Sequence, residues 1–168
     1  MAPQAATAAA AAVILAEGDS WFSHPLVKTP IHVLQDNGHN VVNLAKAGDT
    51  LEGMLTKRQY APFLRAGGVS HILFSGGGND VLGELRALLN QISFSHTDPN
   101  NPAHVAYYIK ADFKAVLRLL RAGYVRLIDD VRSISPGTRI MLNGYAYARA
   151  VAHGAFIGDD FEFLGSGV

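Results

Sequence analysis

The stretch Val13-Ile14-Leu15-Ala16-Glu17-Gly18-Asp19-Ser20-Trp21 decides the fold that we predict for this chain. It opens with a short apolar run rich in branched side chains and breaks at a glycine, a pattern that predicts a buried parallel strand ending in a turn. In open α/β sheets, ligands bind in the crevice outside the carboxyl ends of the strands. Ser20 is therefore predicted to lie where chemistry takes place.

Similar apolar runs follow along the chain and alternate with helical segments. The alternation predicts right-handed crossovers and one parallel sheet with helices on both faces, a three-layer α/β/α arrangement. Because parallel strands end at the same edge of a sheet, the glycines that follow them should gather there. The later strands are predicted at 40–45, 71–75 and 139–143, the helices at 26–36, 51–67, 81–89 and 113–131, and the closing glycines are Gly18, Gly48, Gly76 to Gly78 and Gly144.

The composition excludes several functions. The 14 basic and 14 acidic residues balance, and only 17% of the 168 residues are charged, so the basic surface that nucleic acids or anionic membranes need is not expected. No cysteine occurs, which excludes disulfides, zinc–thiolate sites and a cysteine nucleophile. No apolar run reaches the ~18 residues needed to span a bilayer.

The N-terminus is rich in alanine. We predict that residues 1–12 form a disordered tail and that residues 13–168 form a single domain. A secretory signal peptide is disfavoured, because no Lys or Arg precedes the apolar part and cleavage near Ala16 would remove the first strand. The cytoplasm is therefore the favoured location.

Three strand ends carry groups suited to acyl transfer. Ser20 has a hydroxyl, Gly48 has a backbone N–H with no side chain to block approach, and Asn79 has two amide hydrogens. A serine nucleophile needs a base to take its proton and donors to receive the negative charge that forms on the substrate. The three strand ends supply the donors.

Four neighbouring side chains have structural interpretations. Asp19 and Asp80 are predicted to brace turns through backbone hydrogen bonds, with support of an active site as the sharper alternative. Trp21 and Phe22 are predicted to belong to the core or to the wall of a pocket.

Three sequence blocks resemble those of the GDSL-type, or SGNH, hydrolases. They are Gly18-Asp19-Ser20, the turn at Gly48, and Gly77-Gly78-Asn79-Asp80, which matches a Gly-x-Asn-Asp pattern. The resemblance covers residues 13–147 and implies a flavodoxin-like parallel sheet. It implies an esterase or lipase acting on carboxylic esters through an acyl-enzyme on Ser20. It also implies an oxyanion hole formed by the backbone N–H groups of Ser20 and Gly48 and by the side chain of Asn79.

The resemblance implies neither a metal nor an organic cofactor, and a small-molecule ester is the expected partner. It further implies a base in a fourth block, Asp-x-x-His, near the end of the domain. No such block follows the fourth predicted strand, and the last strand and helix of the fold are not visible there. We therefore expect a chain truncated at its C-terminus. The alternative function is a catalytically inactive remnant, whose exposed sheet edge would favour self-association.

Another histidine would have to replace the missing base. His153 is the best substitute, although Ala150 stands where the aspartate is expected. Surface or structural roles are favoured for all seven histidines, which are His24, His32, His39, His71, His96, His104 and His153.

A nucleotide- or flavin-binding domain is a third interpretation, because the run from Gly76 to Gly78 could cradle a phosphate. The dinucleotide pattern fails, since Val81 stands where its third glycine is needed. No Lys-Ser or Lys-Thr follows, and Asp80 would repel a phosphate. Ester hydrolysis is the interpretation we favour.

Overall fold

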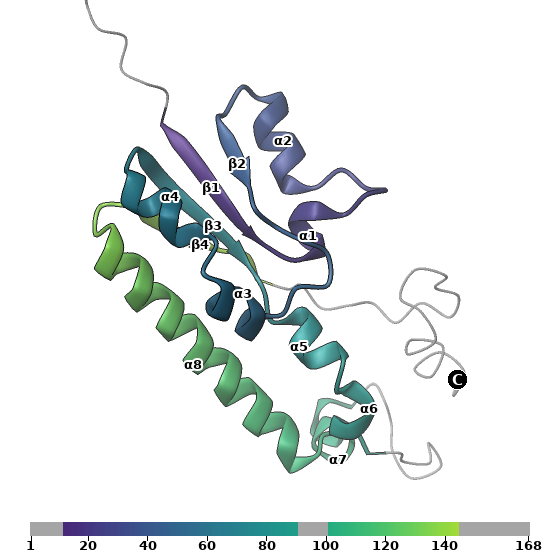
Figure 1. Ribbon diagram of the computed structural model, residues 1–168. Helices are drawn as coiled ribbons and strands as arrows, with labels where there is room; N and C mark the ends of the chain where they lie inside the picture. The colour runs from purple at the N-terminus through teal and green to yellow at the C-terminus, as the bar shows by residue number, and fades with distance from the viewer. Residues whose placement is uncertain (1–11, 91–100, 145–168) are drawn as a thin grey trace, which may run out of the picture.

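The computed structural model of the chain describes residues 12–90 and 101–144. A parallel sheet in the order β2-β1-β3-β4 forms its centre (Figure 1). β1 is therefore an inner strand, and the loops that follow β2 and β3 lie on either side of the loop that follows β1. The strands are β1 (Val13–Gly18), β2 (Val41–Asn43), β3 (Val69–Ser75) and β4 (Arg139–Leu142).

Helices cover both faces of the sheet and confirm the predicted α/β/α layers. α3 (Leu51–Lys57), α4 (Tyr60–Ala66) and α8 (Ala111–Ile134) pack on one face, and α1 (Ser20–Ser23) and α2 (Pro30–Asp36) pack on the other (Figure 1). Shorter segments, α5 (Gly78–Leu82), α6 (Leu85–Leu88), η2 (Pro102–His104) and α7 (Val105–Tyr108), connect β3 to α8.

The alternation of side chains along β1 divides the core into two clusters. Leu15 packs in the larger cluster with Leu51 and Leu127, on the side of α3 and α8. Ala16 packs in the smaller cluster with Phe22 from α1 and with Ile31 from α2. Burial on both faces explains why four consecutive apolar residues open this strand, where a half-exposed strand would alternate with polar residues.

Several predicted helices begin or end elsewhere in the structure. The first predicted helix starts only at Pro30, where the Thr29 hydroxyl caps it. The helix predicted over 51–67 is two helices, because Arg58 adopts a left-handed conformation with φ of 49° and ends α3. The helix predicted over 81–89 begins earlier, at Gly78, and breaks into α5 and α6.

The structure excludes Trp21 from the core, whereas the predicted alternative, the wall of a pocket, stays a prediction. The side chain of Trp21 is 50% exposed, whereas that of Phe22 is buried. The helix that starts at Ser20 directs consecutive side chains to different sides, so only Phe22 faces the sheet.

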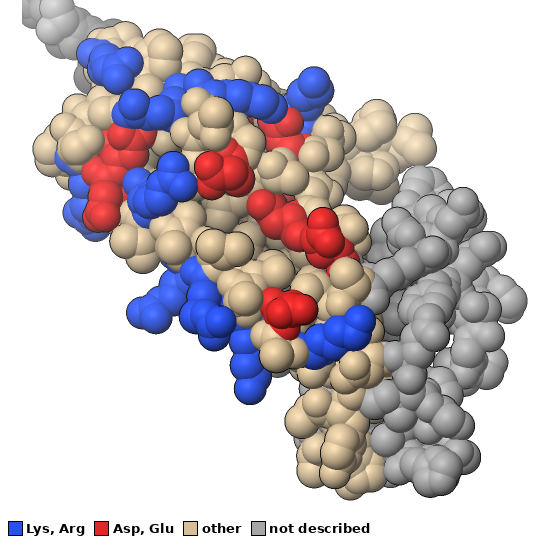
Figure 2. All heavy atoms as spheres, turned by 60° about the horizontal axis from the view of Figure 1, so that its bottom comes forward, with Lys and Arg blue, Asp and Glu red and all other residues tan. Residues whose placement is uncertain are grey.

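Part of the sequence lies outside the described residues, including His96, His153 and nearly all of the predicted tail. The domain limits, the truncation and the self-association therefore stay predictions. Among the described residues, no helix is both long and apolar enough to cross a membrane. Acidic and basic side chains are intermingled on the face seen when the lower side of Figure 1 is turned forward (Figure 2).

Candidate active site

Ser20 is the first residue of α1, directly beyond the carboxyl end of β1. Asp19 caps this helix, because its Oδ1 accepts the Trp21 N–H at 3.1 Å. The Ser20 side chain is half-buried, and its backbone N–H belongs to the first helical turn, where no carbonyl of the helix can accept it. The hydroxyl and one free N–H are thus presented together at the sheet edge.

Close packing between strands explains the glycine before this turn. A Cβ at Gly18 would lie 2.8 Å from the carbonyl oxygen of Ser75, so the strand end has no room for a side chain. The Asp19 N–H donates to that same oxygen at 3.1 Å, and the Ser75 hydroxyl donates to Asp19 Oδ1 at 3.2 Å. The end of β1 is therefore fixed to the end of β3, and the bracing role predicted for Asp19 is confirmed.

The turn at Gly48 lies beside Ser20 on the β2 side. The Lys46 N–H donates to the Gly18 carbonyl at 2.9 Å and holds this turn against the end of β1. Gly48 has φ of +86°, and a Cβ placed there would meet nothing within 4 Å. Its N–H has no hydrogen-bond partner among residues 12–90 and 101–144, so it is available to a ligand.

Asn79 reaches the same turn from the β3 side. Its Nδ2 donates to the carbonyl of Asp49 at 2.8 Å, which leaves the second Nδ2 hydrogen for a ligand. The adjacent Asp80 carboxylate accepts the Leu51 N–H at 2.9 Å, which confirms its predicted bracing role. The third block is thereby joined to the second at two points.

Tyr124 supports the glycine-rich loop from α8, a role that the sequence did not reveal. Its hydroxyl donates to the Gly76 carbonyl at 2.6 Å. Burial raises the pKa of Tyr124, so it remains a neutral donor. The periodicity of α8 identified Tyr124 only as a position on the apolar face, and its polar tip was not predicted to support the site.

Glu17 is a second feature that the sequence did not single out. The residue is 1% exposed, and neither carboxylate oxygen has a hydrogen-bond partner among the described residues. Burial, with repulsion by Asp49 as the second cause, raises its pKa to about 7, against the opposing effects of the nearby Gly18 N–H and of Lys57. The sequence signal that could have identified Glu17 is an acidic residue inside an otherwise apolar strand.

The described histidines make contacts of their own. His32 completes the cap of α2 with Thr29, and its Nδ1 accepts the Thr29 N–H at 3.1 Å. The ring of His71 lies 2.9 Å from the Ser70 hydroxyl, and that of His104 lies 3.4 Å from Asn101. Nδ1 of His24 accepts the Leu26 N–H at 3.1 Å.

The spacing Asp-x-x-His does occur once in the sequence, at Asp36 and His39. This pair lies between α2 and the start of β2, whereas Ser20 follows the carboxyl end of β1. Because β1 and β2 are parallel, His39 lies at the opposite edge of the sheet from Ser20. It therefore does not replace the expected fourth block.

The parallel sheet and the helices on its two faces together define a three-layer α/β/α protein. The chain has this fold, as comparison with solved structures shows. It superposes on a point mutant of esterase AlinE4 with a TM-score of 0.51 and 18% identity, over 96% of this chain and 70% of that one. It superposes on the lipase Lip_vut3 from a goat rumen metagenome with a TM-score of 0.52 and 18% identity, over 79% of this chain and 64% of that one. No family model and no curated protein matches the sequence.

Proposed function

We propose that this chain is a serine hydrolase of carboxylic esters, with Ser20 as the nucleophile. The observation that carries the proposal is the hydrogen bonding among three strand-end loops. Lys46 N–H to Gly18, Asp19 N–H to Ser75 and Asn79 Nδ2 to Asp49 join the three loops at one edge. This arrangement supports the roles that the resemblance implies, and the esterase and lipase structures of the same fold support the substrate class.

The reaction uses the groups presented there. Ser20 Oγ attacks the carbonyl carbon of the ester and loses its proton to a base, while the carbonyl oxygen gains negative charge. The N–H groups of Ser20 and Gly48 and the second Nδ2 hydrogen of Asn79 receive that charge. The alcohol leaves with a proton from the base, and water then hydrolyses the acyl-enzyme by the same route.

An inactive remnant is the second candidate. It is favoured by the histidines of the described residues, because four of them are held by other groups and His39 lies at the far edge of the sheet. Without a base, Ser20 is too weak a nucleophile, and oxyanion donors alone retain only a small part of catalysis.

Hydrolysis of 4-nitrophenyl acetate by the full chain distinguishes the two candidates. We expect activity in the wild type, none in Ser20→Ala and full activity in the control Ser133→Ala, whose exposed hydroxyl lies on α8. Circular dichroism checks folding, and an ethyl phosphonate ester should label Ser20 in the mass spectrum. Activity that survives in Ser20→Ala contradicts the nucleophile. A folded but inactive and unlabelled wild type supports the remnant, whereas activity directs the next test to His153.

A further inference from the structure

We infer that Glu17 is a positioning residue for the oxyanion donors, and that its neutral carboxyl allows the Asp49–Lys57 ion pair to hold the turn that carries Gly48. The inference rests on the proposed function, because it concerns the same donors. It adds a residue that belongs to none of the three sequence blocks, and it predicts a dependence on pH near neutrality.

The position of Glu17 in β1 places it on the face of the sheet that α3 covers. Side chains two residues apart share a face of a strand, so Glu17 lies on the same face as Leu15, which belongs to the same buried cluster as Leu51 of α3. The turn that carries Gly48 leads directly into α3, whose cap is Thr50. Glu17 is thus a buried acid on the strand face that α3 covers, near enough to Asp49 and Lys57 for both charges to act on it.

Two charged groups act on Glu17 from this side. Asp49 precedes α3 and Lys57 ends it, and they form an ion pair with 2.8 Å between Nζ and Oδ1. From the sheet, the neighbour in register is the uncharged Phe74. From α8, the Tyr124 ring meets Phe74 edge-on, and its hydroxyl is already bound to a backbone carbonyl.

The ammonium group of Lys57 therefore interacts with two carboxyl groups, those of Asp49 and Glu17. When Glu17 is protonated, Lys57 pairs with Asp49 alone. When Glu17 ionises, it acquires a buried charge on oxygens that make no hydrogen bond in this structure, repels Asp49 and competes for Lys57. The electrostatic balance that fixes Asp49 is then lost.

Asp49 transmits this change to the oxyanion donors. Its backbone carbonyl is the acceptor that orients the Asn79 side chain at 2.8 Å, and its neighbour along the chain is Gly48. A displacement of Asp49 therefore moves both groups together. Ser20 is held separately, by the cap and by the Asp19–Ser75 bonds, so the effect falls on the donors rather than on the nucleophile.

Nuclear magnetic resonance of the full chain tests the inference without any need for activity. The amide resonances of Gly48 and of the Asn79 side chain are followed from pH 5 to pH 9, together with the Glu17 carboxyl carbon. We expect all three to titrate with one midpoint near 7 in the wild type. In Glu17→Gln, which keeps the neutral shape, the shifts of Gly48 and Asn79 should disappear.

Glu52→Gln is the matched control, since Glu52 is an exposed carboxylate on α3 and should leave the titration unchanged. The inference is overturned if Gly48 and Asn79 do not titrate with Glu17 in the wild type, or if they titrate equally in Glu17→Gln. Should that variant fail to fold, Lys57→Gln provides the second test. Removal of the ammonium should move the Glu17 midpoint upward, and an unchanged midpoint overturns the inference.

A kinetic measurement then separates this inference from the proposed function. If the chain hydrolyses 4-nitrophenyl acetate, kcat should fall above pH 7 in the wild type, and Glu17→Gln should retain its kcat there with little change in KM. If Ser20→Ala remains active, the proposed function is rejected, but the titration of the Gly48 and Asn79 resonances still stands as an independent result. Conversely, if hydrolysis requires Ser20 while kcat depends on pH in the same way in the wild type and in Glu17→Gln, only the role of Glu17 is rejected.

Discussion

The side-chain amide of Asn79 donates to the backbone carbonyl of Asp49 at 2.8 Å, across the gap between the loops that follow β3 and β2. One nitrogen therefore performs two tasks, since one hydrogen fixes the neighbouring turn and the other remains available for a ligand. This bond couples two of the proposed oxyanion donors, the Gly48 N–H and the Asn79 side chain, through Asp49.

Replacement of Asn79 by alanine should reduce kcat of the proposed esterase by about a hundredfold or more, because loss of one oxyanion donor typically costs ~3 kcal/mol of transition-state stabilisation. The measurement is steady-state hydrolysis of 4-nitrophenyl acetate. Asn37→Ala is the matched control, since its amide bonds the Val33 carbonyl at the exposed end of α2. An unchanged kcat in Asn79→Ala removes this side chain from the oxyanion hole.

Replacement of Gly18 by alanine should destabilise the fold by about 1–3 kcal/mol, as overpacking in a closely packed interior does. The new Cβ would lie 2.8 Å from the Ser75 carbonyl and 3.0 Å from the Phe22 ring, so the ends of β1 and β3 must separate. Urea unfolding measures the effect. Gly137→Ala is the control, because a Cβ there meets nothing within 4 Å. Equal stability of the two variants would contradict the packing argument.

The stability of the chain should carry a pH dependence that originates at Glu17. Burial raises its pKa from 4.5 to about 7, so between these values the unfolded chain releases a proton that the folded chain keeps. The contribution of this group to stability therefore falls as the pH rises from 4.5 to 7 and is constant outside that window. The full difference amounts to at most about 3 kcal/mol.

Urea unfolding of Glu17→Gln at pH 5 and pH 8 tests this dependence. The variant should match the wild type at pH 5 and exceed it at pH 8, because glutamine cannot ionise. Glu52→Gln, which alters an exposed pair with Arg126, should show no such change between the two pH values. The same difference from wild type at both pH values would show that Glu17 ionises equally in the folded and unfolded chain.

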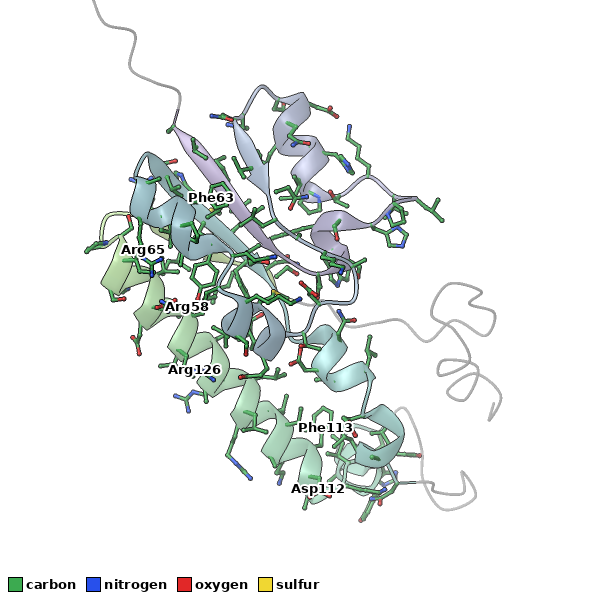
Figure 3. The ribbon with its side chains drawn as sticks, in the orientation of Figure 1. Arg58, Phe63, Arg65, Asp112, Phe113 and Arg126 are labelled. Atoms are coloured by element: carbon green, nitrogen blue, oxygen red, sulfur yellow. The ribbon has the colours of Figure 1, made fainter. Side chains whose placement is uncertain are left out.

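Asp130 should anchor α8 to the junction of α3 and α4. Its carboxylate accepts from Arg58 Nε at 2.9 Å and from the Tyr60 hydroxyl at 2.7 Å, and Arg58 lies where that junction faces α8 (Figure 3). Asp130→Ala should therefore destabilise the fold by about 1–3 kcal/mol, because it leaves the hydroxyl of the buried Tyr60 without its partner. Thermal unfolding measures the change. The exposed neighbour variant Asp129→Ala should lie within about 0.5 kcal/mol of wild type, and an equal loss in both would contradict the anchoring role.

The sequence by itself determined the order of the strands along the chain and the edge at which their closing loops meet. An apolar run interrupted only by Glu17 and ending in Gly18 predicts a buried strand, and its alternation with helices favours parallel pairing. Ser20, Gly48 and Asn79 could therefore be assigned to one sheet edge from local patterns alone.

Only the tertiary structure decided which side chains hold these loops together. Asn79 donates to Asp49, and Tyr124 donates to Gly76, although each pair is far apart in sequence. Arg58, where α3 ends, likewise bonds Asp130 of the distant α8. The hydrophobic periodicity of a sequence predicts the face of the helix or strand on which a side chain lies, but it does not predict the hydrogen-bond partner of that side chain. For the same reason the pKa of Glu17 could not be foreseen, because it depends on burial and on charges brought close by folding.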